Sequence, residues 1–346
     1  MNTTPLRLTL LLIIVSGLFL MIAGMATAQD DPTAEPTEEP TGDENTALIE
    51  RGEYLAKIAN CETCHTPFQE KYNNLAELTL EDLQTIAMRE ELALDKEERL
   101  MAGGRPFDLG PAGVMFTRNL TPDPETGLGE WTDEEIEIAI RTGISRDGRQ
   151  LHPLMPYTIF NQMADADMDA IIAYLRSIPA VENAVPVIDF GLPNMGLPLS
   201  DEEIVMPDPE AEPEAYRHYL LTSVLGCTHC HTPVDPNTGA PMMDQFLGGG
   251  QPYEGPWGIV YGTNLTPHEN GLAAWSEDDI ARVLTSGVRI DGRRLILMPW
   301  QDYANLTLED LDAVITYLVE DLEPIDTLVP AAALNEGFDE RVELSN

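Results

Sequence analysis

Apolar residues recur at helical spacing in four stretches of the chain, two in each half. The first stretch of each half runs into a pair of cysteines, and its apolar face is formed by Tyr54, Leu55 and Ile58, and then by Leu220, Leu221 and Val224. The last stretch has apolar residues at positions i, i+3, i+4 and i+7: Met168, Ile171, Ile172 and Leu175, and then Leu311, Val314, Ile315 and Leu318. This spacing places apolar side chains on one face of an α-helix. We therefore expect a helix at the beginning and at the end of each half.

Between these helices the sequence predicts further helices and loops rather than strands. Thr132 and Glu135 follow Trp131 with the spacing of a capping box, and Ser276 and Asp279 stand at the matching places in the second half. The remaining stretches are rich in Gly and Pro, and little of the chain alternates as a strand would. The expected fold class is all-α and loop-rich.

The chain contains an internal repeat. Asn-Leu-Thr-Pro at 119–122 recurs at 264–267, and Asp-Gly-Arg at 147–149 recurs at 291–293. Shifts of 143 to 145 residues relate matched positions, whereas the two cysteine pairs are 166 residues apart. We therefore predict two tandem domains of one fold, of which the first carries an insertion.

The repeat and the composition divide the chain into six predicted segments. In order, these are an export segment, a disordered acidic tether rich in Pro and Thr, a first domain, a linker, a second domain and a polar tail, at residues 1–28, 29–46, 47–182, 183–212, 213–325 and 326–346. The insertion lies within about 66–102 and is charged and helix-favouring. We expect it to form a solvated helical hairpin, with a contact to a partner protein as the alternative.

Residues 1–28 have the features of an export signal. Arg7 is the only charged side chain among them, an apolar run extends from Leu8 to Met25, and Ala26-Thr27-Ala28 fits a cleavage site. The run of 18 residues is also long enough for an uncleaved membrane anchor. Either interpretation places the rest of the chain in the periplasm or at the outer face of the cell membrane.

The strongly acidic composition excludes nucleic acid as a natural partner. The formal net charge is -41, and binding to phosphates requires a basic surface. An acidic protein of this kind would associate with a basic patch on a partner protein, although a solvated surface is an equally good interpretation.

All four cysteines fall in two identical patterns, Cys-x-x-Cys-His, at residues 61–65 and 227–231. This is the pattern of c-type haem attachment, in which two thiols add to the haem vinyl groups and the histidine binds the iron. A four-thiolate zinc site would need the pairs closer than the 162 residues that separate them, and disulfides would not require the histidines. We predict two covalently bound haem c groups, held by Cys61, Cys64 and His65, and by Cys227, Cys230 and His231.

The repeat also selects the second axial ligand of each haem iron. Among the remaining His and Met residues, only Met155 and Met298 are matched between the halves, and each precedes a proline in a loop. A lone methionine more often fills a core, but the matched register favours ligation of the iron by His and Met. Such an iron has no open site and transfers single electrons, which predicts a carrier rather than an enzyme.

Other repeated residues have two interpretations. Asn119, Asn264, Arg149 and Arg293 could hydrogen-bond haem propionates, with two tryptophans, Trp131 and Trp275, packed nearby. They could equally serve turn formation and core packing.

The repeated series of Gly-x-Pro-Phe/Tyr, Asn-Leu-Thr-Pro, Asp-Gly-Arg, Met-Pro and a closing Tyr-Leu resembles the cytochrome c subunits of membrane-bound alcohol, gluconate and fructose dehydrogenases. The resemblance covers residues 48–182 and 213–322. It implies a class I cytochrome c fold in each half, with thioethers at the four cysteines and axial ligands at His65, Met155, His231 and Met298. Those subunits usually carry three haems, whereas this chain has two attachment motifs.

The leading hypothesis is therefore a dihaem electron carrier of the respiratory chain. Its donor would be a dehydrogenase with a flavin or quinone cofactor, or another quinol-side donor, and its acceptor could be a terminal oxidase. A dihaem enzyme with one open haem, such as a peroxidase or a thiosulfate-oxidising cytochrome, is the alternative. A haem-based gas sensor ranks last.

Overall fold

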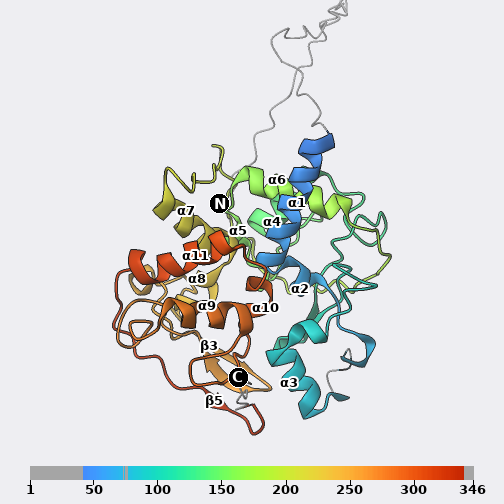
Figure 1. Cartoon of the computed structure of the whole chain (residues 1–346). Coiled ribbons are helices and arrows are strands. Elements are labelled where there is room, and N and C mark those ends of the chain that lie inside the picture. Colours follow the sequence, from blue (N-terminus) through green and yellow to red (C-terminus); the bar gives the residue numbers. More distant parts are fainter. Residues whose placement is uncertain (1–41, 73, 75–76, 339–346) are drawn as a thin grey trace, which may run out of the picture. The chain divides into compact units, whose positions relative to one another are not determined.

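The computed structural model describes residues 42–72, 74 and 77–338 (Figure 1). The predicted export segment and residues 29–41 of the predicted tether lie outside these ranges. The described residues belong to one compact unit that contains both halves. Among the described residues, no helix has the length and apolar character needed to cross a membrane.

The first half consists of short helices and one hairpin. In chain order its elements are α1 (Gly42–Ile58), α2 (Cys61–His65), η1 (Glu70–Tyr72), α3 (Leu80–Met88), η3 (Glu90–Leu92), β1 (Pro106–Asp108), η4 (Gly110–Ala112), β2 (Val114–Phe116), α4 (Asp133–Thr142), α5 (Tyr157–Phe160) and α6 (Asp165–Ser177).

The second half follows the same order without a counterpart of α3. Its elements are α7 (Pro213–Tyr219), the π-helical turn η5 (Leu220–Val224), α8 (Cys227–His231), η6 (Met243–Gln245), β3 (Pro252–Gly255), β4 (Gly258–Tyr261), α9 (Glu277–Ser286), α10 (Trp300–Tyr303), α11 (Leu308–Thr316), the π-helical turn η7 (Tyr317–Asp321) and β5 (Ala333–Leu334).

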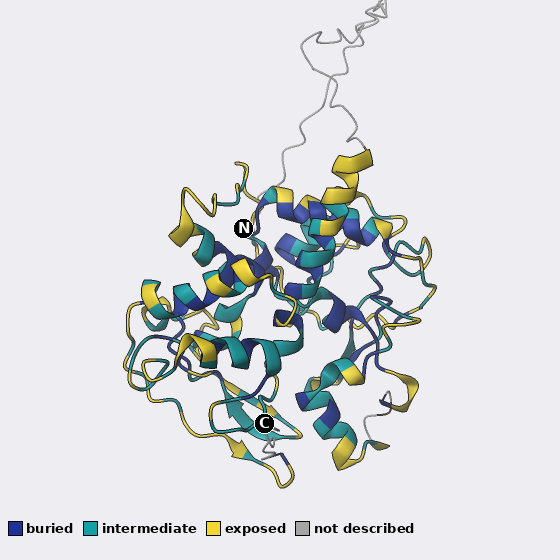
Figure 2. Cartoon of the chain, in the orientation of Figure 1, coloured by how far each residue is buried: buried dark blue, intermediate teal, exposed yellow. Residues whose placement is uncertain are grey.

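The predicted apolar helix faces form one core that extends through both halves. Helix α1 lies directly against α6, and a Cβ atom added at Gly52 would lie 1.8 Å from the carbonyl oxygen of Ala170 (Figure 1). Figure 2 shows the buried residues concentrated where these helices meet. The side chains of the predicted faces are buried except those of Tyr54 and Leu311, which are half-buried. Burial of these faces is the main stabilising contribution that the repeat encodes.

Both predicted capping boxes are confirmed. The hydroxyl of Thr132 accepts from the backbone N–H of Glu135, and Glu135 accepts from the N–H of Thr132 in return. Ser276 and Asp279 make the same pair of hydrogen bonds at the start of α9. Each box satisfies two backbone donors that the first turn of a helix leaves without partners.

The all-α prediction was incomplete, because each half contains a small antiparallel sheet. Strands β1 and β2 pair in the first half, and β3, β4 and β5 pair in the second. Strands of two to four residues are too short to give a readable alternation of polar and apolar positions. Strand β5 comes from the predicted tail, whose Ala333 pairs with Ile259 of β4.

The insertion contacts the second half instead of projecting into solvent as a hairpin. The backbone N–H of Leu297 donates to the carbonyl of Ala87 at 3.3 Å, and the side-chain amide of Gln84 donates to the carbonyl of Gly337. The insertion also has its own small core, formed by Phe68, Tyr72, Ala93 and Leu94. The sequence did not predict this contact because the charged residues of the segment dominate its composition.

The structure moves one predicted boundary and adds contacts to the predicted linker. Helix α1 begins at Gly42, so residues 42–46 of the predicted tether are helical. Residues 183–212 contain no helix or strand and run along the first half, where the side-chain amide of Asn183 donates to the carbonyl of Ala102 at 2.9 Å. The linker is thus held to one half by specific hydrogen bonds.

Candidate haem-binding site

The two cysteine motifs form matched short helices. Helices α2 and α8 each begin after a residue in the left-handed conformation, Asn60 with φ 65° and Gly226 with φ 66°. Each ends at a threonine whose hydroxyl accepts from a distant backbone N–H: Thr66 from Met101 at 3.1 Å, and Thr232 from Leu247 at 3.0 Å. The same local fold therefore supports both motifs.

The two motif histidines are oriented by matched carbonyl groups. His65 Nδ1 lies 2.8 Å from the carbonyl oxygen of Arg118, and His231 Nδ1 lies 2.7 Å from that of Thr263. A carbonyl only accepts, so Nδ1 carries the proton and Nε2 keeps a free lone pair. Burial lowers the pKa of His65 to about 4 and also lowers that of His231. Both rings are therefore held as neutral imidazoles, the form that binds a metal.

The carbonyls that orient the histidines belong to the residues immediately before the repeated Asn-Leu-Thr-Pro turns. The side-chain oxygen of Asn119 accepts from the N–H of Thr121 at 3.0 Å, and its amide donates to the carbonyl of Val181 at 2.8 Å. Asn264 makes the same kind of bonds with Thr266 and Ile325. Of the two interpretations of these asparagines, the structure favours turn formation.

The four cysteines are free thiols that line a common cavity and form no disulfides. Burial raises the pKa of Cys61 to about 12 and that of Cys64 to about 11, so both are protonated at neutral pH. Free, paired thiols beside an apolar cavity fit covalent attachment of a haem, and the disulfide alternative is not formed.

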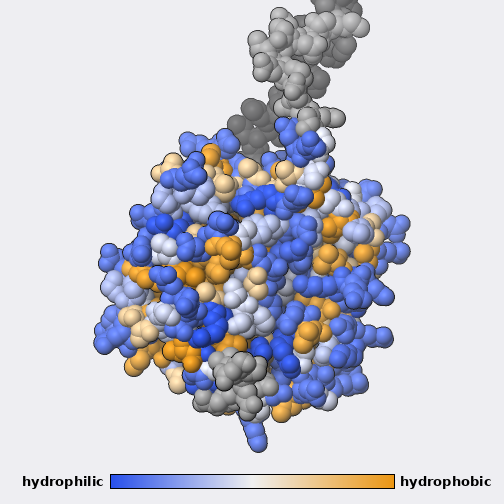
Figure 3. Space-filling model, viewed as in Figure 1, coloured by the Kyte–Doolittle hydropathy of each residue, from blue (hydrophilic) through white to orange (hydrophobic). Residues whose placement is uncertain are grey.

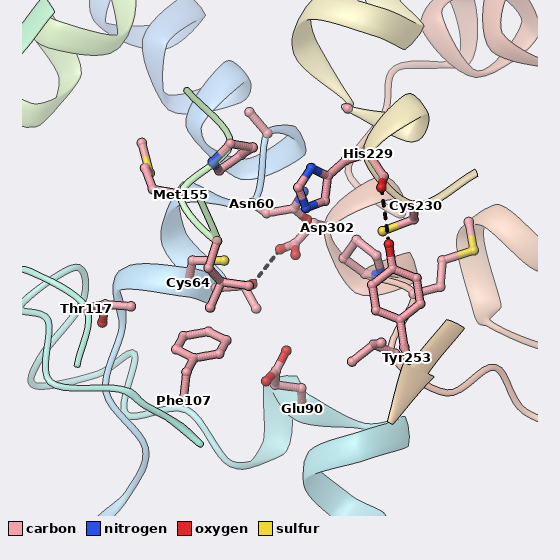
Figure 4. Close-up of a pocket in the computed structure, with 18 of the residues that line it drawn as sticks. Asn60, Cys64, Glu90, Phe107, Thr117, Met155, His229, Cys230, Tyr253 and Asp302 are labelled. Carbon is pink, nitrogen blue, oxygen red and sulfur yellow. Dashed lines mark hydrogen bonds between the residues drawn. The ribbon is translucent and has the colours of Figure 1, made fainter. Parts of the chain in front are cut away.

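One continuous cavity of about 1810 Å³ connects the two motifs. Its wall includes both motif histidines and both matched methionines, Met155 and Met298. Both repeated tryptophans also line it, beside Ile136 and Ile280. Figure 4 shows Cys64 and Met155 on one side of the cavity and Cys230 with Tyr253 on the other. An apolar space with sulfur and imidazole ligands fits haem chemistry.

Arginines gather on this cavity although the protein is strongly acidic. The wall contains Arg105, Arg118, Arg146, Arg149, Arg289, Arg293 and Arg294. Within the part of the chain that the structure describes, the buried Nε atom of Arg105 has no hydrogen-bond partner. The Nε atoms of Arg149 and Arg289 lie 3.5 and 3.8 Å from carboxylate oxygens of Asp147 and Asp291. The unpartnered Nε of Arg105 fits a carboxylate of a haem, since unsatisfied buried polar groups are otherwise costly.

The other histidines and methionines that could serve as axial ligands make different contacts. His218 Nδ1 hydrogen-bonds the hydroxyl of Tyr317 at 2.6 Å, and Met163 and Met168 are fully buried in the core. His152 lines the cavity, where its ring meets that of Phe190 edge to face. The matched methionines remain the best candidates on symmetry.

Sequence reasoning missed four buried carboxylates, at Glu62, Asp167, Asp302 and Asp310. Asp167 and Asp310 stand one residue before Met168 and Leu311, so they occupy matched positions in the last helices. An acidic residue repeated beside an apolar stripe was the available signal, and neither acid was recognised as buried.

Residues 49–179 match the cytochrome c family. The chain carries a cytochrome c domain. The cytochrome c domain includes helices α2 and α6 and therefore the first attachment motif, and membership of this family implies covalently bound haem c.

Curated relatives are similar over more of the chain than this domain. A subunit of the nicotinate dehydrogenase of Pseudomonas putida is 32% identical over 287 residues, which are 79% of this chain and 21% of that protein. The cytochrome c subunit of an alcohol dehydrogenase (quinone) from Gluconacetobacter polyoxogenes is 31% identical over 89% of this chain and 60% of that protein. A diheme cytochrome c-type protein of Cereibacter sphaeroides is 30% identical over 56% of this chain and 66% of that protein. The chain thus spans less than two thirds of the length of each.

Proposed function

We propose that this chain is an extracytoplasmic dihaem cytochrome c that passes single electrons from a dehydrogenase toward the respiratory chain. Each half would be a class I cytochrome c domain, at residues 47–182 and 213–325. The thioethers would form at Cys61 and Cys64 and at Cys227 and Cys230. The axial ligands would be His65 with Met155, and His231 with Met298.

The observation that carries this proposal is the matched geometry of the two motifs. In both, the histidine donates from Nδ1 to a carbonyl that immediately precedes the repeated asparagine. The matched methionines line the same cavity as both histidines. A haem bound there supplies a one-electron store, and His/Met ligation raises its reduction potential.

The protein's own residues prepare the site for this chemistry. The carbonyl bonds fix the tautomer and the ring orientation of His65 and His231, which increases their basicity as ligands. The cavity arginines compensate acidic groups of the cofactor, and the apolar wall excludes water. Saturated coordination would leave no position for a substrate.

The proposed partners follow from the relatives and from the charge. Two of the relatives are named as subunits of dehydrogenases, which supports a dehydrogenase as the electron donor. Hydrophilic side chains cover much of the face in Figure 3, and the formal net charge is -41. Such a surface favours a docking partner with a basic patch. Association with the membrane would rest on residues 1–28.

A haem count combined with absorption spectroscopy tests the proposal. The full-length protein from a host that attaches haem c should contain two haems per chain. The ferric spectrum should have the charge-transfer band of Met-bound iron at full intensity for both haems. One haem per chain, a high-spin spectrum, or binding of carbon monoxide to the untreated reduced protein would reject a dihaem relay. The last two results would favour a redox enzyme with one open haem.

A further inference from the structure

Asp302 on α10 is a buried carboxyl group between the two attachment motifs. Its residue is 3% exposed, and its Oδ1 accepts from the hydroxyl of Thr63, between Cys61 and Cys64, at 2.6 Å. Its Oδ2 is buried and has no hydrogen-bond partner within the described ranges. In Figure 4, Asp302 lies between Cys64 and Cys230. A buried carboxylate with one free oxygen is costly unless the group takes up a proton.

Tyr303, the residue after Asp302, contacts the backbone just before the second attachment motif. The hydroxyl of Tyr303 donates to the carbonyl of Leu225 at 3.0 Å, two residues before Cys227. In the first half the position matched to Asp302 is Ile159 of α5, where a Cβ added at Gly226 would lie 3.6 Å from the Ile159 side chain. Each short helix therefore reaches the attachment motif of the other half. Only the one in the second half brings a carboxyl group.

We propose that Asp302 is a proton-binding site whose occupancy is coupled to reduction of the haem held by Cys61 and Cys64. This inference rests on the proposed function, which supplies the haem and the electron donor. When one electron enters that site, Asp302 takes one proton from solvent onto its carboxylate. When the electron leaves toward the acceptor, the proton returns to solvent.

The surroundings of Asp302 place its pKa close to neutral pH. Burial is the main reason that its pKa is raised, to about 7; the charge of Glu90 also raises the pKa, whereas the hydrogen bond from Thr63 and the positive charges of Lys96 and Arg105 lower it. Glu62, Cys61, Cys64 and Tyr303 complete the titratable neighbourhood, and the two cysteines carry no charge once they are thioethers.

Reduction of the haem would change the electrostatic potential at Asp302. The oxidised iron carries one more positive charge than the reduced iron, so it favours the carboxylate. The carboxyl group therefore binds its proton more tightly in the reduced protein. By linkage, the midpoint potential of this haem must fall as the pH rises through the titration range.

Redox titration of the full-length haem protein at a series of pH values between 5 and 9 tests the proposal. In the wild-type protein, one of the two midpoint potentials should fall with rising pH across neutrality. Asp302→Asn removes the titrating group but keeps the shape, so this dependence should be lost. Thr63→Val removes a donor that favours the carboxylate, so the fall should move to higher pH.

Asp310→Asn provides a matched control. Asp310 is also buried, but both of its oxygens accept from tyrosine hydroxyls, and it touches neither attachment motif through these bonds. This variant should retain the pH dependence of the wild type.

The proton-binding proposal is overturned if both wild-type potentials are constant near neutral pH, or if Asp302→Asn keeps the wild-type slope. Either result would leave the two-haem relay intact, whereas its own failure would appear earlier, in the haem count.

Discussion

The hydroxyl of Tyr54, on the first helix of the first half, donates a hydrogen bond to Asp310, on the last helix of the second half. The reverse contact is also made, because the hydroxyl of Tyr219 donates to Asp167 at 2.7 Å. Since the two acids occupy matched positions, the interface between the halves is reciprocal.

Each acid also has a donor from its own half. Arg51 binds both oxygens of Asp167, at 2.9 and 3.0 Å, and Tyr216 donates to Asp310 at 2.6 Å. Four donors thus converge on two buried carboxylates. Removing one donor should be more costly than the loss of an exposed hydrogen bond.

Tyr54→Phe and Tyr219→Phe should each destabilise the protein by about 1–3 kcal/mol, because each leaves a buried carboxylate short of a donor. The free energy of unfolding in urea measures this effect. Tyr261→Phe is the control, since no hydrogen bond of its hydroxyl is found among the described residues, and it should change stability little. Equal losses in all three variants would contradict a role for the reciprocal contacts.

Gly52→Ala should destabilise the protein by roughly 3 kcal/mol or more, because the new methyl group would collide with the backbone of α6. Gly42→Ala, in the same helix, is the matched control because nothing lies within 4 Å of its Cβ position. Thermal unfolding of the two variants compares them directly. A tolerated Gly52→Ala would mean that α1 and α6 do not cross so closely.

Met155→Ala and Met298→Ala should each remove half of the ferric charge-transfer band of Met-bound iron, and each should lower one midpoint potential. The thioether sulfur stabilises the ferrous state, and its loss opens one axial position. Met115→Leu is the control, because Met115 lines the same cavity but is not matched in the second half. A spectrum unchanged in both alanine variants would exclude these ligands.

Replacing Cys61 and Cys64 together by Ala should leave one covalently bound haem, and replacing Cys227 and Cys230 should leave the other. Two thioethers per haem explain why each pair acts as a unit. Haem staining of the denatured chain, normalised to protein, measures the loss. If one double variant lost all covalent haem while still folding, the two sites would not be independent in attachment.

The pH dependence of stability should report on Asp302. Its pKa is raised in the folded protein, to about 7, so the proton binds more tightly to the folded than to the unfolded chain. The resulting stabilisation is complete below the ordinary pKa of aspartate and is lost as the pH rises through about 7. Its scale is about 1.4 kcal/mol for each unit of pKa difference.

Asp302→Asn has no such proton to lose. Its free energy of unfolding should therefore increase relative to that of the wild type as the pH rises from 4 to 8. If the difference in free energy of unfolding between the two proteins stays constant over this range, the pKa of Asp302 is not raised in the folded protein.

The helices of this protein could be predicted because their signals are local. The apolar stripe ending at Leu175 and the capping box of Thr132 depend on residues within two turns of each other. The matched positions of Met155 and Met298 could be found for a similar reason, since an internal repeat compares the sequence with itself.

The contacts between the halves could not be predicted in this way. Asp302 and Thr63 are 239 residues apart, and the position matched to Asp302 is an isoleucine, so the repeat gave no indication of a buried acid. Asp310 stands beside the apolar stripe of the last helix, where local spacing alone does not indicate burial. Only the approach of Tyr54 from the other half makes it a buried acceptor.

The first half forms all of its buried contacts only when the second half is present. A chain that ends at residue 182 has Arg51 for Asp167 but lacks Tyr219, which follows 37 residues later. Truncated chains that end in the linker would contain the first attachment motif, but the carboxylate of Asp167 would lack its hydrogen bond from Tyr219. Such fragments should be more sensitive to proteolysis than the full-length protein, because a buried carboxylate lacks one of its donors.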